Sequence, residues 1–376
     1  MEKTNLKKAI VHDWFAGYAG SERVVESFTN LFPNVPVYVL FNLLTKEEQE
    51  IVTKNSEIVT SFINKFRGVK KNHRKYLPLF PYAIEQFDFS NYDLILSSSH
   101  AVSKGVLVNA NQLHICYCHT PMRYAWDLTY QYLKESKLDK GLFGLFAKIV
   151  LHYIRIWDAS NTNRVDYFIA NSNYIKKRIK KIYGRDSEVI YPPVDTQNFK
   201  CETQKDNYYL AASRLVQYKK IDLIAQAFTK MPDKKLIIVG DGPEEKKIKA
   251  HSGNNIELVG FQQGEALTQY MQKAKAFVFA ADEDFGIMVV EALSAGTPVI
   301  AFNKGGVRET IKKEETGILF NEQSTESIIE AVKTFEQKEN SFDSISLSNY
   351  AKQFDRKIFE EKINKFVSDK CEKFFN

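Results

Sequence analysis

The sequence predicts an α/β protein built from two doubly wound parallel sheets. Short apolar runs alternate with helical patterns of roughly 10–15 residues, which is typical of βαβ units. The alternation occurs twice along the 376 residues, a length that exceeds the roughly 100–200 residues usual for one domain. The double proline Pro192-Pro193 separates the two series. Because proline can neither extend a helix nor donate to a strand ladder, we expect domains of residues 1–190 and 191–353.

Each series supplies five predicted strands, enough for one sheet. The first series comprises residues 9–11, 37–41, 94–97, 114–118 and 167–170. The second comprises residues 208–212, 236–239, 256–259, 276–279 and 298–302. Beyond them, apolar residues recur at helical spacing from Phe354 to Val367. This pattern predicts an amphipathic helix over 354–376 that docks back on the protein, most simply on the first domain.

Composition indicates an ordinary globular protein, with 44% apolar and 26% charged residues and a net charge of +6. The apolar run after the first lysines is too short for a signal-peptide core. The most apolar stretch, residues 141–157, is interrupted by Lys148, His152 and Arg155 and falls short of the ~20 apolar residues of a membrane span. The four cysteines form no Cys-x-x-Cys pair. We therefore expect a cytoplasmic protein without a transmembrane helix.

A basic segment without any acid lies between Phe62 and Tyr82, where cations alternate with aromatic and aliphatic side chains. The cations considered for binding are Lys70, Lys71, Arg74 and Lys75. Such a segment suits an anionic membrane surface that carries a lipid-linked acceptor, and it equally suits a solvated face whose aromatic side chains turn inward. Because the sequence holds no nucleic-acid-binding module, we expect no nucleic-acid partner.

A candidate binding loop follows the predicted strand 276–279. The loop contains Glu283 and Gly286, and the helical run 287–295 comes directly after it. Exposed N–H groups at such a helix start, at the carboxyl edge of a parallel sheet, bind phosphates. Glu291 lies about one turn inside this helix, so the two carboxylates can reach opposite ends of one ligand.

Two further loops of the second series could contribute to the same pocket. Arg214 and Lys219 follow the strand 208–212, and a guanidinium with an ammonium forms a plausible clamp for a diphosphate. Gly305-Gly306 follows the strand 298–302 and allows the backbone to approach a ligand closely. Taken alone, each feature usually has a structural explanation. An acidic loop before a helix is usually a cap, a cation after a strand is usually solvated, and Gly-Gly is usually a turn. Their order along the chain makes the pocket the better interpretation.

Residues 208–320 resemble the retaining family-four glycosyltransferases of the GT-B architecture. The matching motifs are Arg214-Leu215-x3-Lys219, Val239-Gly240-Asp241-Gly242-Pro243, Val259-Gly260-Phe261, Glu283-x7-Glu291, Ala295-Gly296-x-Pro298-Val299-Ile300 and Gly305-Gly306-x-x-Glu309. The resemblance implies two Rossmann-like domains and a nucleotide-sugar donor as substrate. It implies neither a cofactor nor a metal ion.

The resemblance also implies a role for each matching residue. Arg214 and Lys219 would hold the diphosphate, Gly260 and Phe261 would lie beside the nucleobase, and Glu291 would bind the ribose. Glu283, the first catalytic candidate, would contact the hydroxyls of the donor sugar. Backbone N–H groups of Phe285, Gly286, Ile287 and Met288 would hold sugar and phosphate. The stereochemical route, front-face attack or double displacement, stays open.

The first half contributes a small-residue loop and a histidine. The run Gly17-Tyr18-Ala19-Gly20-Ser21-Glu22-Arg23 is similar to the family's Gly-Gly-x-Glu-Arg loop near the donor phosphates, with Gly20 as the position that transfers. His119 follows the predicted strand 114–118, where the family often places a histidine beside the reacting sugar. His100, after the preceding strand, is the rival candidate, and a capping or core role is the alternative for either.

A narrower resemblance suggests the donor sugar. The run Tyr117-Cys118-His119-Thr120-Pro121-Met122-Arg123-Tyr124-x-Trp126-Asp127 and the loop Glu283-Asp284-Phe285-Gly286-Ile287 look like the bacterial mannosyltransferases of lipopolysaccharide O-antigens and related surface glycans. This resemblance implies GDP-mannose, with Arg123, Tyr124 and Trp126 as acceptor-side candidates.

Three other functions compete with this hypothesis. A UDP-sugar transferase or a sugar-nucleotide epimerase would share the architecture, and an inactive scaffold of glycan assembly would share the fold alone. Asp282-Glu283-Asp284 could also be taken for the Asp-x-Asp metal site of the other large glycosyltransferase fold. Cations and a helix N-terminus could already neutralise the leaving group here, so we expect no metal.

Overall fold

The computed structural model describes residues 6–376, and its chain divides into two compact units. The first unit runs to Tyr191 and includes Glu360–Asn376; the second is Pro192–Phe359. We expected the whole helix 354–376 to join the first domain, but its first residues belong to the second unit. The reason is local, because the Val194 N–H donates to the carbonyl of Phe354 (3.1 Å) and the Arg356 guanidinium pairs with Asp195 (2.6 Å).

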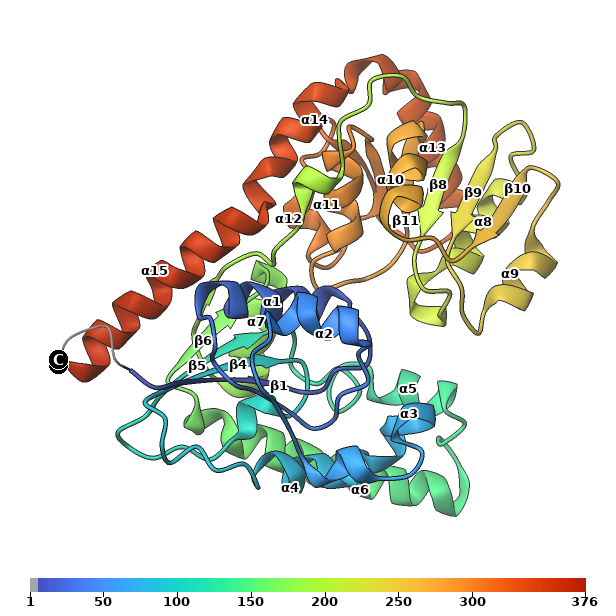
Figure 1. Ribbon diagram of the computed structural model, residues 1–376. Coiled ribbons are helices and arrows are strands. Elements are labelled where there is room, and N and C mark those ends of the chain that lie inside the picture. Colours follow the sequence, from blue (N-terminus) through green and yellow to red (C-terminus); the bar gives the residue numbers. More distant parts are fainter. Residues whose placement is uncertain (1–5) are drawn as a thin grey trace. The chain divides into compact units, whose positions relative to one another are not determined.

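The first unit contains a seven-stranded sheet in the order β3-β2-β1-β4-β5-β6-β7 (Figure 1). Its strands are β1 (Lys8–His12), β2 (Val37–Val39), β3 (Ile58–Thr60), β4 (Leu94–Ser99), β5 (Leu113–Cys118), β6 (Tyr167–Ala170) and β7 (Ser187–Val189). All neighbouring strands in it pair in parallel. The chain order reverses between β1 and β4, which makes that position the switch point of the sheet.

The second unit contains a six-stranded parallel sheet in the order β10-β9-β8-β11-β12-β13. Its strands are β8 (Tyr209–Ala212), β9 (Leu236–Val239), β10 (Ile256–Gly260), β11 (Ala276–Phe279), β12 (Val299–Phe302) and β13 (Gly317–Phe320). Here the order reverses between β8 and β11. The two doubly wound parallel sheets confirm the predicted fold class.

Three strands were not predicted, and all three are sheet edges: β3, β7 and β13. β3 and β7 are three residues long, and no residue of β3 is fully buried. These two strands are covered incompletely, so their sequences need not form the continuous apolar run by which buried parallel strands are recognised; β13, by contrast, is mostly buried. The predicted strand at 37–41 is also shorter in the structure, ending at Val39.

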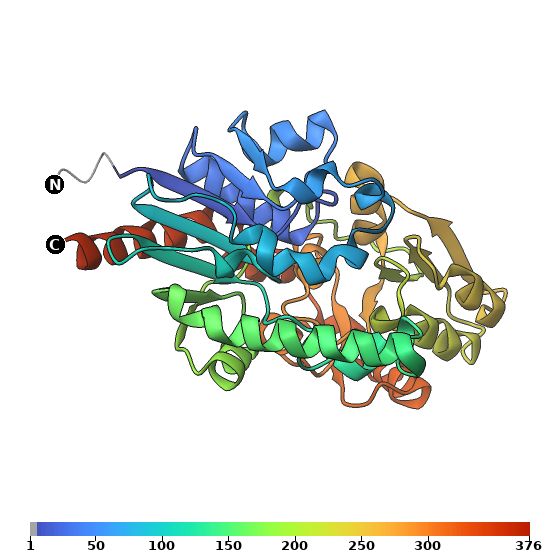
Figure 2. The ribbon, with the colours of Figure 1, turned by 90° about the horizontal axis from the view of Figure 1, so that it is seen from below.

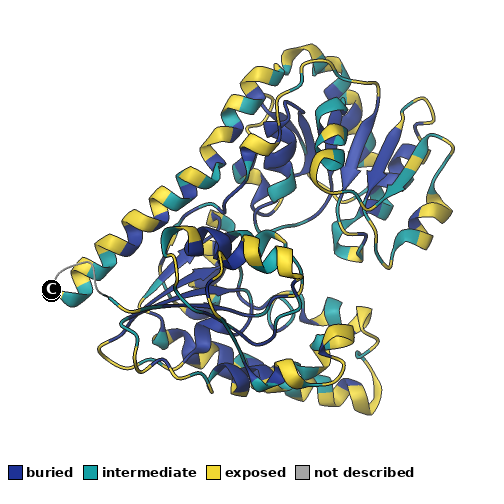
Figure 3. Cartoon of the chain, viewed as in Figure 1, coloured by how far each residue is buried: buried dark blue, intermediate teal, exposed yellow. Residues whose placement is uncertain are grey.

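Helices cover both faces of each sheet. They are α1 (Gly20–Leu31), α2 (Lys46–Thr53), α3 (Val69–Asn72), α4 (Phe80–Ile84), α5 (Thr129–Glu135), α6 (Gly141–Ser160), α7 (Asn173–Tyr183), α8 (Ile221–Thr229), α9 (Glu245–His251), α10 (Gly264–Lys273), α11 (Ile287–Ser294), α12 (Val307–Thr310), α13 (Thr325–Lys338), α14 (Ser344–Ala351) and α15 (Arg356–Phe375). In the first unit, α1 and α2 lie on one face of the sheet, and α4 and α6 on the other (Figure 1). The central strands are buried, whereas the helices present exposed residues outward (Figure 3).

The strands supply the core of each unit. In the second unit, β-strand residues pack with Ile224, Phe228 and Phe335 of the covering helices α8 and α13. In the first, apolar residues of β1 and β4 pack with those of α4 and α6, and apolar residues of β5 and β6 pack with those of α7. No helix among residues 6–376 is both long and apolar enough to cross a membrane.

Candidate active site

The candidate site residues of the second unit follow the strands at its switch point. Arg214 and Lys219 come after β8, and Glu283 comes after the adjacent β11. Because carboxyl ends of parallel strands share one edge of a sheet, these side chains are brought to the same edge although about 65 residues separate them along the chain. This is where open α/β sheets bind their ligands.

Lys219 and Glu283 form an ion pair in the structure, and both side chains are mostly shielded from solvent. The pair joins a clamp cation to the proposed sugar-binding carboxylate. The neighbouring acid, Asp282, pairs instead with Lys304 (3.1 Å). The carboxylates of Asp282 and Glu283 therefore bind different lysines, and the described residues contain no group of three or more His, Cys, Asp or Glu side chains that could hold a metal ion.

Gly305 and Gly306 support the acidic loop. A Cβ on Gly305 (φ +77°) would lie 2.2 Å from the carbonyl oxygen of Glu283, and one on Gly306 would lie 2.1 Å from that of Asp284. The Gly306 N–H donates to the Glu283 carbonyl at 2.8 Å. We expected these glycines to let backbone approach a ligand; the backbone that they approach in the structure is that of the Glu283 loop.

Glycines also fix the loop that carries Arg214. A Cβ on Gly240 would lie 1.9 Å from the Ser213 carbonyl oxygen, and one on Gly242 would lie 2.4 Å from that of Leu215. The Leu215 N–H donates to the Asp241 carbonyl at 2.7 Å. The Gly-Asp-Gly motif after β9 thus holds the clamp loop after β8, with the Arg214 side chain exposed.

α11 begins directly after the acidic loop. Gly286 is its N-cap with φ +85°, so the Ile287 and Met288 amides stand at the free N-terminus of the helix. Phe285 is buried and packs against Phe354. Glu291 is only 3% exposed. The structure thus places Glu283 and Glu291 on one loop and helix, with Glu291 the more deeply buried carboxylate.

Gly260 and Phe261 lie at the carboxyl end of β10, an edge strand. Gly260 has φ +74° and accepts a hydrogen bond from the Gly240 N–H (2.8 Å). The Phe261 ring is 61% exposed. An exposed aromatic ring beside this loop offers a surface on which a planar base could stack. β9 and β8 separate this residue from the acidic loop after β11.

In the first unit, a buried aspartate organises the switch point. The carboxylate of Asp13, just after β1, accepts four backbone hydrogen bonds of 2.6–2.9 Å from His100, Ala101, Val102 and Ser103. Its Oδ2 also lies 3.0 Å from His100 Nδ1. Burial raises the pKa of Asp13, but the charge and hydrogen bonds of His100 outweigh burial and hold that pKa well below its usual value.

His100 is the other half of this pair. Burial lowers its pKa, but the charge and hydrogen bond of Asp13 outweigh burial and raise the pKa above the ordinary value. The side chain keeps 27% of its surface exposed. His100, the rival candidate of the sequence analysis, is therefore an oriented imidazole with a carboxylate on Nδ1, the arrangement that fixes histidine orientation in many sites.

His119 lies beside this pair, after β5. Its Nε2 is 2.8 Å from Ser98 Oγ, and His12 Nδ1 is 3.0 Å from the Ser98 carbonyl oxygen. Burial, reinforced by the charges of His100 and His12, lowers the pKa of His119 well below its usual value. His119 is thus a neutral imidazole near neutral pH. The structure brings both histidine candidates together, with ring centroids 6.3 Å apart.

Sequence reasoning assigned no role to Asp13, Ser98 or His12, which link these histidines. Their position along the chain could have identified them. Polar residues at the carboxyl ends of the strands on either side of a switch point lie close together in the fold. Gly20, the loop position carried over by resemblance, is the first residue of α1. Glu22 completes that helix start, since the Ala19 N–H donates to its Oε2 at 3.1 Å and its Oε1 lies 3.7 Å from His12 Nε2.

Trp126, an acceptor-side candidate, is engaged inside the protein. Its indole N–H donates to Asp158 Oδ2 (2.7 Å), and Asp158 forms a buried ion pair with Lys104. Tyr124 is buried enough that its pKa rises well above the ordinary value. Arg123 is partly exposed. The Trp126 N–H is therefore already paired within the first unit, and an acceptor-side role for these three residues stays a prediction.

The basic segment 62–82 presents its cations outward. Lys70, Lys71, Arg74 and Lys75 are all exposed. Most of the interleaved apolar side chains, by contrast, pack into the core of the first unit; these are Phe62, Phe66, Tyr76, Leu77 and Phe80. Only Leu79 and Tyr82 are largely exposed. The segment is thus mainly a solvated basic face with inward aromatics, the second of the two interpretations.

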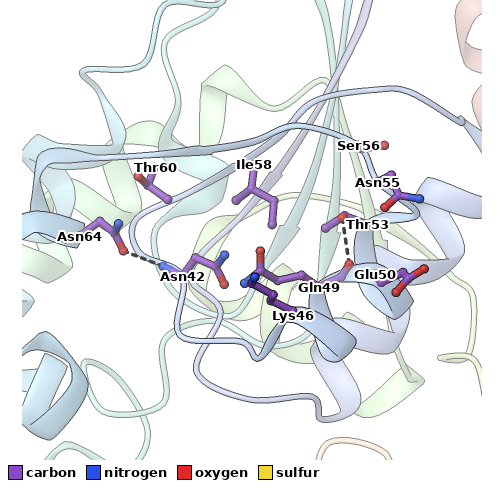
Figure 4. A pocket seen from close by; sticks show the side chains of 10 residues that line it. All are labelled: Asn42, Lys46, Gln49, Glu50, Thr53, Asn55, Ser56, Ile58, Thr60 and Asn64. Atoms are coloured by element: carbon purple, nitrogen blue, oxygen red, sulfur yellow. Dashed lines mark hydrogen bonds between the residues drawn. The ribbon is translucent and has the colours of Figure 1, made fainter.

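A separate cavity of about 660 Å³ lies beside α2 and β3 of the first unit (Figure 4). Polar side chains such as Asn42, Gln49 and Asn64 line it, and the Asn42 N–H donates to Asn64 Oδ1 at 3.0 Å. No predicted site residue lines this cavity. We therefore build no function on it.

Two family models match the chain in succession. The model described as "Glycosyltransferase Family 4" covers residues 18–198, and the model described as "Glycosyl transferases group 1" covers residues 195–370. Together they include every predicted site residue of both units.

The curated proteins with similar sequences include a mannosyltransferase. The GDP-mannose-dependent alpha-(1-6)-phosphatidylinositol monomannoside mannosyltransferase of Mycobacterium tuberculosis is 30% identical over 192 residues, 43% of this chain and 50% of that protein. The sulfoquinovosyl transferase SQD2 of Arabidopsis thaliana is 28% identical over 40% of this chain. The alignments span 31% of SQD2 and 67% of the N-acetyl-alpha-D-glucosaminyl L-malate synthase of Bacillus anthracis.

Solved structures match nearly the whole chain. Anabaena Alr3699/HepE, in complex with UDP and glucose, superposes with a TM-score of 0.70 at 18% identity over 97% of this chain and 100% of that one. WaaG, a glycosyltransferase involved in lipopolysaccharide biosynthesis, superposes with a TM-score of 0.67 at 15% identity over 96% and 99%. At these identities the likeness concerns the fold.

Proposed function

Because this chain belongs to the family-four glycosyltransferases and has their GT-B fold, we propose that it transfers mannose from GDP-mannose, with retention, to a lipid-linked or growing surface-polysaccharide acceptor. The observation that carries the proposal is the Lys219–Glu283 pair next to the free N-terminus of α11, at the switch point of the second sheet. A cation, a carboxylate and helix amides together match a sugar joined to a diphosphate.

In this proposal each group of the second unit has one task. Arg214 and Lys219 neutralise the diphosphate, and the α11 amides bind phosphate and sugar, so that the leaving group needs no metal ion. Glu283 accepts hydrogen bonds from sugar hydroxyls. When the donor binds, Lys219 either breaks its ion pair with Glu283 or shares the carboxylate with the sugar. Glu291 binds the ribose, and Phe261 stacks on the base. In the first unit, His119 or His100 is the histidine that lies beside the reacting sugar.

The mannose donor is supported by the subgroup motifs and by the mycobacterial relative, whose name states GDP-mannose dependence. A UDP-sugar is the second candidate, because HepE has been solved with UDP and with UDP-glucose. Calorimetric titration of the full chain with GDP and with UDP should give the tighter binding for GDP. Tighter binding of UDP would replace the donor and leave the fold and the donor-site assignments in place.

Substitution of the two glutamates tests the site. Glu291→Ala should weaken GDP binding by on the order of tenfold or more, since it removes a hydrogen-bonding carboxylate from the nucleotide. Glu283→Gln should leave GDP affinity nearly unchanged and lower turnover of GDP-mannose by on the order of a hundredfold. Glu326→Gln, an exposed acid on α13, is the control and should change neither value. Equal, mild effects of all three substitutions would refute the assignment.

A further inference from the structure

α6 carries an apolar face that the rest of the first unit leaves uncovered. Half of the large hydrophobic residues that are exposed among residues 6–376 lie on this one helix. They are Leu142, Phe143, Leu145, Phe146, Ile149, Tyr153 and Ile156, exposed by 47–84%. Folded monomers rarely leave so large a contiguous apolar patch to water, and such patches mark interaction surfaces.

The exposed residues form one stripe along the helix. From Leu142 to Ile156 they recur every three or four positions, so they share one side of a helix about 30 Å long. The opposite side packs into the protein through buried residues such as Leu151, Ile154 and Trp157. α6 lies in front of the sheet when the unit is seen from below (Figure 2). The stripe therefore belongs to the surface of the folded unit.

The charges around this stripe are cationic. Lys148, His152 and Arg155 follow one edge of α6, and its one acid, Asp158, is fully buried in the ion pair with Lys104. The preceding residues 134–140 hold three lysines and two acids. Trp157 donates to Glu85 at the end of α4 (2.9 Å), which ties α6 to the segment whose cations are exposed. An apolar stripe with a cationic edge complements an anionic lipid surface.

A cavity adjoins the cationic edge. It has a volume of about 460 Å³ and lies between α5 and α6. Lys148 and Arg155 line it together with Trp126 and Tyr130, and no carboxylate is among its lining residues. Tyr130 is 83% exposed. Two cations beside an exposed tyrosine suit a phosphate group at the boundary between water and lipid.

From these observations we propose that α6 is a membrane-docking helix: its exposed stripe lies in the headgroup region of an anionic phospholipid membrane, and Lys148 and Arg155 bind lipid phosphate in the adjoining cavity. The helix lies on the membrane and does not cross it. This assignment rests on the proposed function only in that a lipid-linked acceptor requires the enzyme at a membrane. It moves the docking surface from the basic segment 62–82 to α6, with the basic segment as an electrostatic supplement.

Sedimentation of the full chain with vesicles tests the apolar stripe. The chain should bind vesicles of phosphatidylcholine mixed with phosphatidylglycerol more tightly than vesicles of phosphatidylcholine alone. Ile149→Gln should lower the partition coefficient by on the order of tenfold, because the transfer free energy of the isoleucine side chain from water to lipid is lost. Ile345→Gln, on α14, is a matched control, because Ile345 is 56% and Ile149 57% exposed. Equal partitioning of the two variants would overturn the proposal, as would absence of binding by the unmodified chain.

A second pair of variants tests the cationic edge of α6. Lys148→Gln should weaken binding several-fold, and only to vesicles that contain phosphatidylglycerol. Lys333→Gln, an exposed lysine on α13, changes net charge equally and should have a smaller effect. Equal losses would show a nonspecific charge effect and overturn the role of the cavity.

Two further measurements distinguish this proposal from self-association of the chain and from the proposed function. A dimer in the absence of lipid that Ile149→Gln dissociates, seen by analytical ultracentrifugation, would identify a second copy as the occupant of the stripe and overturn the membrane assignment. Calorimetry with GDP should give the same affinity for Ile149→Gln and the unmodified chain, because the donor groups lie in the second unit. Failure of the unmodified chain to bind GDP would remove the proposed function and leave the vesicle result standing.

Discussion

Asp13 shows how a single residue shapes the first unit. Its two oxygens accept the four successive amides after β4 and orient His100. An ionised carboxylate at full burial is costly unless every lone pair is satisfied, and here the amides and the imidazolium satisfy it. The loop that follows β4 and the orientation of the His100 imidazole are therefore set by one side chain.

The Asp13–His100 pair predicts a pH dependence of stability. Since the folded pKa of His100 is raised, the stability it contributes is present at low pH and is lost as the pH rises through that raised pKa. Since the folded pKa of Asp13 is lowered, its contribution is present above the unfolded value near 4 and is lost in acid. The difference in unfolding free energy between the unmodified chain and His100→Gln should therefore be largest at about pH 6 and shrink toward about pH 9.

Urea unfolding of both proteins across this range measures that difference. His119→Gln serves for comparison, with the opposite sign: the folded pKa of His119 is lowered, so its contribution to stability should rise as the pH increases through the unfolded value near 6.5. A difference for His100→Gln that stays constant from acid to alkaline pH would show that the pKa of His100 is the same in the folded and unfolded protein, which contradicts the pairing with Asp13.

At the scale of elements, loops at the strand ends are held by close backbone contacts that only glycine permits. Gly240 and Gly242 join the loops after β9 and β8, and Gly305 and Gly306 join those after β12 and β11. The candidate site residues Arg214 and Glu283 lie on the loops that these contacts fix. The glycines of the resembling motifs thus hold the loops that carry these candidate side chains.

Gly305→Ala tests this positioning. Its Cβ would lie 2.2 Å from the Glu283 carbonyl oxygen, so the acidic loop must shift, and the protein should lose about 2 kcal/mol or more of stability beyond the cost of a positive φ. Gly184→Ala has a similar φ of +68° with no atom within 4 Å of the added Cβ, so it reports the conformational cost alone, about 1 kcal/mol.

Thermal unfolding and turnover of GDP-mannose would be measured for both variants. Gly305→Ala should reduce turnover through displacement of Glu283, whereas Gly184→Ala should not. If the two variants lose equal stability and keep equal turnover, the contact between Gly305 and the acidic loop does not position Glu283.

At the scale of the whole molecule, α15 divides its residues between the two units. Its first residues belong to the second unit, and Glu360–Asn376 belong to the first. In the first unit Ile363, Phe366 and Val367 are buried, and the Phe366 ring lies edge-on to Tyr167 at 6.3 Å. The end of the chain thus completes the core of the unit in which the chain begins.

Phe366→Ala should therefore destabilise the first unit by about 3 kcal/mol, the usual cost of removing a buried phenylalanine. Hydrogen exchange should show faster exchange in β5 and β6 with unchanged exchange in β8 and β9. Lys373→Ala, an exposed residue of the same helix, is the control. Equal acceleration in both sheets would mean that the two units unfold as one.

Local sequence patterns were sufficient for the central strands and for the acidic loop of the second unit. Buried parallel strands need continuous apolar runs, and the Glu283-x7-Glu291 spacing follows from one strand, one loop and one helix. The short edge strands β3 and β7 were missed because they are only partly covered, whereas β13 was missed although Ile318 and Phe320 are buried. The split of α15 was missed because it depends on contacts of Val194 and Asp195 with residues 160 positions away.

The sequence by itself determined the two doubly wound sheets and the family of the chain, because both are encoded in periodicity and in short motifs. Only the tertiary structure decided which polar groups meet. It paired Lys219 with Glu283 and Asp13 with His100, directed the Trp126 N–H to Asp158, and left one face of α6 uncovered. These outcomes depend on long-range packing: α6 is apolar on two sides, and its periodicity alone cannot reveal which side the core covers.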